Sequence, residues 1–209
     1  MQPAHDEPEA GMQADATETA TPRRSAGATR ERILEATNRL FYTEGIRATS
    51  ADRIIEEVGI TKVTFYRHFR SKSDLVVAYL THQAAAEREW FQGMRRADDP
   101  LGSLHAIASG IGAASCSPGF RGCAFINAAA EFSDPHDPVR AVVDAHRQWM
   151  LETFAAIAAD AGIEDTEGTA RQLMMVRDGA MVNGYLGNPE SVAESLRGAF
   201  DSVLSATRD

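Results

Sequence analysis

The segment "ADRIIEEVGITKVTFYRHFRSKSDL", residues 51 to 75, decides the fold. Its first half has apolar residues with the spacing of one helix face, at Ala51, Ile54, Ile55 and Val58. Gly59 then permits the positive φ of a tight turn, and Thr61 is a suitable N-cap for a second short helix that ends near Phe69. A helix, a glycine turn and a helix in this order predict a helix-turn-helix unit. A further helix starts at Ser71, with Asp74 placed as in a capping box.

The flanking sequence also predicts helices. The preceding helix is expected from Thr29, as N-cap, to Glu44, with Gly45 as its stop. Beyond residue 71 the apolar residues recur at intervals of three and four, and prolines and glycines separate the periodic segments. These segments predict six helices, at about residues 71–96, 100–115, 123–132, 139–161, 166–186 and 189–206, the last with Asn188 as N-cap. The expected fold is all-α, with nine helices in a three-helix head continuous with a six-helix body.

The composition is that of an ordinary soluble globular protein, with 44% hydrophobic and 24% charged residues among 209. No apolar run approaches the roughly 20 residues of a membrane span. Residues 1–22 hold five acids, three prolines and no Lys or Arg, and they predict a disordered tail without the features of a secretory signal. We therefore expect a cytoplasmic protein. Cys116 and Cys123 are expected to be free thiols, with a redox switch as the less favoured alternative.

The charge is unevenly distributed along the chain. The net charge is −9, yet residues 23–72 hold eleven Lys and Arg against six acids, whereas residues 73–209 hold ten against nineteen. A basic segment on an acidic protein predicts one local surface for a polyanion. Double-stranded DNA is the expected partner, and the predicted domains are the acidic tail (1–22), a DNA-binding domain (23–72) and a body (73–209).

The second helix of a helix-turn-helix pair enters the major groove of DNA. Phe65 and Phe69, four residues apart, are expected to face the core of the head. This leaves five candidate base readers on the outward face: Lys62, Val63, Thr64, Tyr66 and Arg67. Of these, Arg67 could bind guanine with two hydrogen bonds. The candidate phosphate contacts are Tyr66, His68, Lys72, Arg47, Thr49 and Ser50.

Residues 29–80, "TRERILEATNRLFYTEGIRATSADRIIEEVGITKVTFYRHFRSKSDLVVAYL", resemble the N-terminal domain of the tetracycline-repressor (TetR) family of bacterial regulators. The resemblance implies an all-α homodimer on a palindromic operator, with a body whose small-molecule ligand releases the DNA. It places the family's backbone contacts at Tyr66, His68 and Lys72, and its variable readers at Lys62, Val63, Thr64 and Arg67. Many members have glycine or alanine where this chain has Val63. Residues 122–132, "GCAFINAAAEF", are similar to one subgroup of the family's C-terminal domains.

The body offers candidates for a ligand pocket and for a dimer interface. Apolar, aromatic and polar side chains predict the pocket residues Trp90, Phe91, Phe125, Asn127, Glu131, His146, Trp149, Met150, Met174, Arg177 and Asp178. The last two helices predict the interface residues Leu173, Ala180, Met181, Tyr185, Leu196, Phe200 and Val203. For each pocket candidate, ordinary core is the more frequent role, and ligand contact is the alternative.

Two other classes of protein remain as alternatives. One is a small-molecule-binding or scaffolding protein whose head does not bind DNA, with a basic face that is merely solvated. The other is an all-α enzyme that uses Glu131 or His146. The chain has no glycine-rich phosphate loop and no nucleophile elbow. The spacing of Glu131, His136 and His146 fits no familiar zinc pattern, and we expect neither a metal nor a cofactor.

Overall fold

The computed structural model describes residues 22–206, and this part of the chain contains nine α-helices and no strand. The all-α prediction is confirmed. The helices are α1 (Pro22–Glu44), α2 (Ala51–Val58), α3 (Lys62–His68), α4 (Lys72–Met94), α5 (Pro100–Ser115), α6 (Ala124–Glu131), α7 (Pro138–Asp160), α8 (Thr166–Leu186) and α9 (Pro189–Ala206). The predicted acidic tail lies outside the described residues except for Pro22.

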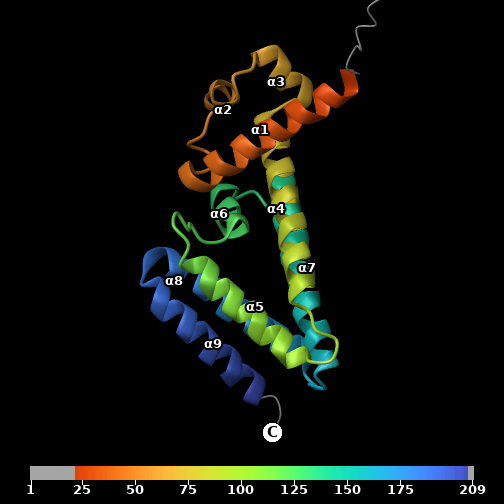
Figure 1. The fold of residues 1–209 in the computed structure, drawn as a ribbon, viewed down its shortest axis with the longest axis vertical. Coiled ribbons are helices and arrows are strands. Elements are labelled where there is room, and N and C mark those ends of the chain that lie inside the picture. Colours follow the sequence, from red (N-terminus) through yellow and green to blue (C-terminus); the bar gives the residue numbers. More distant parts are fainter. Residues whose placement is uncertain (1–21, 207–209) are drawn as a thin grey trace, which may run out of the picture.

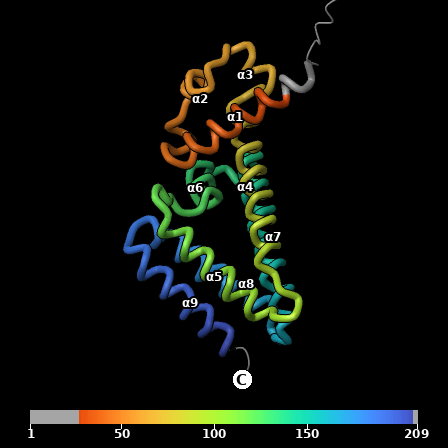
Figure 2. Tube along the Cα trace, viewed as in Figure 1, coloured from red at the N-terminus to blue at the C-terminus, as the bar shows by residue number. Residues whose placement is uncertain are grey.

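The described chain is elongated, with a small head at one end (Figure 1). The head consists of α1, α2, α3 and the first turns of α4, and α4 continues into the body, where it packs against α7 (Figure 1). In the body, α8 packs against α7 and α9, and α5 packs against α9 (Figure 2). The short helix α6 lies between α1 and the rest of the body. The long helix α4 therefore belongs to both parts of the molecule.

The predicted end signals act as expected at the centre of the head. The Ser50 side chain accepts a hydrogen bond from the Arg53 N–H, and the Thr61 side chain accepts one from Thr64, which satisfies one free donor at the start of each helix. Gly59 adopts a φ of 70°, the left-handed conformation in which glycine carries no steric cost. These caps fix where α2 ends and α3 begins.

One predicted boundary is wrong. Helix α1 begins at Pro22, so Thr29 lies inside the helix and is not its N-cap. Proline is well suited to a first helical position, and Gly27 alone, at a cost of about 1 kcal/mol, does not stop the helix. The remaining starts and ends fall within about two residues of the predicted positions.

No helix between Pro22 and Ala206 combines the length and the apolar character needed to cross a membrane. Cys116 is exposed, Cys123 is buried, and both are free thiols.

Candidate nucleic-acid interface and regulatory body

Helix α3 is anchored to the head by one face. Phe65 and Phe69 are buried, and their ring centroids lie 6.1 Å apart. The opposite face is open, and Val63 is 71% exposed although it is apolar. A large apolar group held in solvent on a well-capped helix is available for a partner surface, such as the methyl group of thymine.

The cations of this face differ in their surroundings. The Lys62 ammonium lies 2.9 Å from a carboxylate oxygen of Asp52 on α2, and this hydrogen-bonded pair raises the pKa of Lys62. Arg67 is exposed and forms no ion pair with any residue of the described chain. An unpaired guanidinium on the outward face is free to form two hydrogen bonds to a base or a phosphate. The Asp52 partner of Lys62 was not predicted from the sequence.

The predicted phosphate contacts differ in how far their side chains are exposed to solvent. Arg47 and Ser50 are exposed at the start of α2, and Tyr66 on α3 is about half exposed. His68 and Lys72 are half-buried, and burial lowers the pKa of Lys72.

Thr49 is a correction to the predicted set of phosphate contacts. Its side chain is fully buried, and its hydroxyl donates to the Gly45 carbonyl oxygen at 2.8 Å. The hydroxyl therefore stabilises the turn between α1 and α2 from inside and cannot reach a phosphate.

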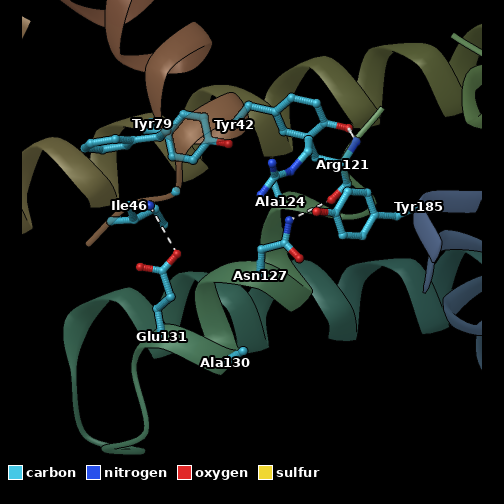
Figure 3. Close-up of a pocket in the computed structure, with 11 residues that line it drawn as sticks. Tyr42, Ile46, Tyr79, Arg121, Ala124, Asn127, Ala130, Glu131 and Tyr185 are labelled. Atoms are coloured by element: carbon cyan, nitrogen blue, oxygen red, sulfur yellow. Dashed lines mark hydrogen bonds between the residues drawn. The ribbon is translucent and has the colours of Figure 1, made fainter. Parts of the chain in front are cut away.

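Hydrogen bonds of Glu131 and Tyr42 join the head to the segment around α6 (Figure 3). The Glu131 carboxylate accepts hydrogen bonds from the backbone N–H groups of Ile46 at 3.1 Å and Arg47 at 2.6 Å. The Tyr42 hydroxyl donates to the Gly122 carbonyl oxygen at 3.1 Å and accepts from the Arg121 N–H at 2.9 Å. Both ends of α6 are thus tied to the C-terminal part of α1 and the turn that follows it.

Arg47 links this junction to the predicted DNA-contacting groups. Its carbonyl oxygen accepts a hydrogen bond from the Lys72 ammonium at 3.4 Å, and its N–H is one of the two held by Glu131. A movement of α6 would therefore shift the backbone of Arg47, and with it the start of α2 and the hydrogen bond of Lys72. Glu131, a predicted pocket residue, thus also has its carboxylate bound to the head.

A buried ionic cluster joins α4, α7 and α8. Arg177 is only 3% exposed, and its guanidinium lies 3.0 Å from Asp178 and 3.7 Å from Glu87. Burial opposes its charge, but Cys123, Glu87 and Asp178 outweigh burial and raise the pKa of Arg177.

The cluster extends to a buried histidine. His146 lies 2.8 Å from Glu87 and stacks on Phe125, with ring centroids 3.7 Å apart. Glu87 connects Arg177 with His146. The sequence does not predict this role, because a glutamate on an amphipathic helix is usually exposed to solvent. Such a network can specify how the helices pack, because separating the two acids from Arg177 leaves its buried charge unpaired.

The predicted pocket residues lie in more than one place. Trp90, Phe91 and Arg177 line one cavity of about 250 Å³ between α4, α5 and α8. Asn127 and Glu131 line a separate cavity of about 260 Å³ at the junction of head and body. The remaining predicted pocket residues line neither cavity: Phe125, His146, Trp149, Met150, Met174 and Asp178.

The predicted dimer residues also divide into two groups. Leu173, Leu196 and Phe200 are buried within the protomer, where their side chains already pack against their own chain. Ala180 and Met181 are also buried, Val203 is half-buried, and Tyr185 is exposed. The exposed large apolar side chains on α8 are Met175, Val182, Tyr185 and Leu186.

An all-α chain with a capped helix-turn-helix head and a helical body is the architecture of a DNA-binding regulator. Comparison with known proteins agrees. Residues 33–79 match the family described as "Bacterial regulatory proteins, tetR family". A TetR-family transcriptional regulator of Streptomyces coelicolor is 41% identical, over 88% of this chain and 97% of that one, with a TM-score of 0.83. The chain therefore belongs to the TetR family, whose members are transcriptional regulators and not enzymes.

Other similarities are narrower. An HTH-type transcriptional regulator of Staphylococcus aureus (strain USA300) is 47% identical over 53 residues, which cover 25% of this chain and 29% of that protein. The matched part thus spans less than a third of that relative. NemR of Escherichia coli in its reduced form has a TM-score of 0.75 over 84% of this chain and 97% of that one, and at 18% identity it shows the fold alone.

Proposed function

We propose that the chain is a cytoplasmic, sequence-specific DNA-binding transcriptional regulator, acting as a homodimeric repressor that a small-molecule ligand releases from a palindromic operator. The observation that carries the proposal is the open face of α3, where Val63 and the unpaired Arg67 stand in solvent on a helix anchored by Phe65. In this proposal α3 enters the major groove. Arg47 and Ser50 at the start of α2 bind the adjacent phosphates, where free N–H groups favour an anion.

Two copies of the head are needed to read a palindrome. The exposed apolar residues of α8 support a two-fold interface in which α8 and α9 of each protomer meet. The two α3 helices would then lie about 34 to 36 Å apart, the repeat of successive major grooves. The proposed units are residues 23–72 for DNA binding and 73–209 for the ligand and the dimer.

Ligand control requires a path from the body to the head. Helix α4 belongs to both parts. Glu131 at the end of α6 holds the α1–α2 turn, and the loop before α6 is bonded to Tyr42 of α1. A ligand that binds the DNA-free arrangement more tightly than the DNA-bound one shifts the population of heads away from the operator spacing. A preference of about 1 to 3 kcal/mol is typical of such coupling.

Charge reversal on α3 tests the proposal. In the variant, Lys62 and Arg67 become Glu, and the half-buried Lys72 becomes Gln so that no acid is placed against the core. We expect it to lose operator binding in a fluorescence anisotropy titration while it keeps the helical circular dichroism of the wild type. The matched control reverses Arg95 and Arg96, which are exposed just beyond α4, away from both the head and the proposed dimer helices. Normal operator binding by the α3 variant would refute the site, and a protein that binds its ligand but no DNA would favour the small-molecule-binding alternative.

A further inference from the structure

The junction of head and body contains a cavity of about 260 Å³ that is distinct from the one between α4, α5 and α8 (Figure 3). Four aromatic rings line it: Phe41, Tyr42, Tyr79 and Tyr185. They come from α1, α4 and α8, so the cavity is bounded by both parts of the molecule. Its size is somewhat below that of sites for drug-sized ligands and suits a ligand with one ring.

Arg121 supplies a positive charge to this cavity. In Figure 3 its side chain extends from the loop before α6 into the space near Tyr42 and Ala124. Its guanidinium carbon lies 4.9 Å from the centroid of the Tyr185 ring. No carboxylate of residues 22–206 forms an ion pair with it, although residues 73–209 hold nineteen acids against ten basic residues. An unpaired cation in such an acidic part of the chain is a candidate partner for an anion.

The main chain of Arg121 is fixed on both sides. Its N–H donates to the Tyr42 hydroxyl at 2.9 Å, and its carbonyl oxygen accepts from the Asn127 amide at 2.9 Å. The next residue, Gly122, has a φ of 77°, and a Cβ there would lie 3.1 Å from the Met181 carbonyl oxygen. The backbone that carries the guanidinium is thus fixed before any ligand binds, and the guanidinium itself rests over the Tyr185 ring. Less conformational entropy is therefore lost on binding.

The start of α6 adds to the positive potential. Ala124, its first residue, lines the cavity, and the preceding Cys123 makes no side-chain cap. The N–H groups of a first helical turn have no acceptor within the helix, and they and the helix dipole favour an anion. The uncapped helix start and the unpaired guanidinium come from adjacent parts of the chain and meet at one wall of the cavity.

The acid that lines the same cavity, Glu131, is hydrogen-bonded to the head. Glu131 ends α6, seven residues after Ala124, which corresponds to about 10 Å along the helix axis. Its carboxylate is held by the N–H groups of Ile46 and Arg47. The two N–H groups that hold the carboxylate, and its place at the far end of α6, weaken its repulsion of an anion at Arg121.

We propose that this junction cavity binds a small organic anion with one aromatic ring, with its carboxylate on Arg121 and its ring among the tyrosines. A carboxylate matches the planar pair of guanidinium donors, and the aromatic rings of Phe41, Tyr42 and Tyr79 line the cavity beside it. The occupied cavity would act on the Tyr42 and Glu131 contacts that tie α6 to the head. This regulatory consequence rests on the proposed function, whereas the binding itself does not.

The test uses the full-length protein without DNA and four probes: benzoate, salicylate, phenylacetate and 3-phenylpropionate, each beside its uncharged amide. Isothermal titration and ligand-detected NMR should show saturable binding of at least one carboxylate, and at least tenfold weaker binding of its amide. Arg121→Gln should abolish the binding, and Arg197→Gln, a matched change on α9, should leave it intact. Arg121→Lys keeps the charge but not the planar donor pair, so it should bind a few-fold more weakly even if the glutamine variant fails to fold.

Three results would overturn the proposal: no binding by any of the four acids, equal binding of acid and amide, or undiminished binding by both Arg121 variants. Because DNA is absent, a failure here leaves the proposed DNA-binding function standing. If the protein binds the acids but shows no selective binding to operator DNA, the proposed function is refuted and the cavity assignment stands.

Discussion

Replacing Glu131 with alanine removes the carboxylate that accepts hydrogen bonds from Ile46 at 3.1 Å and Arg47 at 2.6 Å. A hydrogen bond to a charged group contributes about 1.5 to 3 kcal/mol. The Ile46 N–H is partly buried, so most of the free energy of its hydrogen bond is lost. The exposed Arg47 N–H can form a hydrogen bond to water instead, so less is lost there. A carboxylate at a helix C-terminus is itself unfavourable by about 0.5 kcal/mol, which its removal returns. The net loss expected in the free energy of unfolding is about 2 kcal/mol.

Differential scanning calorimetry and urea denaturation measure this loss. For a chain of this size, about 2 kcal/mol corresponds to a fall in Tm of roughly 4 to 8 °C. Glu131→Gln keeps one acceptor oxygen and should lose about half as much, and Glu89→Ala, an exposed change on α4, is the matched control. If Glu131→Ala falls within about 0.5 kcal/mol of the wild type, as ordinary surface changes do, the carboxylate does not hold the head and the reasoning fails.

Three further predictions concern the interface, an acid–base group and a helix cap. Leu186→Glu places a charge on the exposed apolar face of α8 and should give monomers in analytical ultracentrifugation. The control, Ala156→Glu on the exposed side of α7, should remain dimeric. A Leu186→Glu variant that remains dimeric would show that the interface lies elsewhere. Burial raises the pKa of Tyr79 to about 12 from 10.0, so its neutral phenol stabilises the fold fully below pH 10, and about 2 to 3 kcal/mol is lost as the pH rises through 12. Tyr79→Phe should lack this part of the alkaline decline in urea titrations, and an unchanged decline would contradict the assignment. Thr61→Ala removes the N-cap of α3 and should cost about 1 kcal/mol by denaturation, with an unchanged stability as the contrary result.

The local features of the fold could be predicted from the sequence because their causes are local. Ser50, Gly59 and Thr61 act through hydrogen bonds and dihedral angles within four residues of themselves. The inward turn of Phe65 follows from helical spacing alone. The start of α1 was misplaced because a good N-cap residue such as Thr29 is not obliged to cap when the helix continues through it.

Contacts between distant segments could not be predicted in the same way. The Tyr42 hydroxyl meets Gly122 eighty positions along the chain, and Glu131 meets Arg47 across eighty-four. Periodicity indicates that a side chain faces inward but not which chain covers it. For this reason the sequence predicts Leu173 at a dimer interface, whereas in the structure its own protomer encloses it. Thr49 was assigned to phosphate because a threonine at a helix start usually exposes its hydroxyl.

The proposed DNA-binding function is tested most directly by titrating the purified protein with the DNA that flanks its own gene, at several salt concentrations and beside a scrambled duplex. The open face of α3 and the phosphate contacts near α2 predict selective binding whose affinity falls steeply with salt, because each neutralised phosphate releases a counterion. Replacing Arg67 with alanine should cost about 1 to 3 kcal/mol on the flanking duplex and relax the preference for it. Absence of binding to either duplex at low salt would contradict the account.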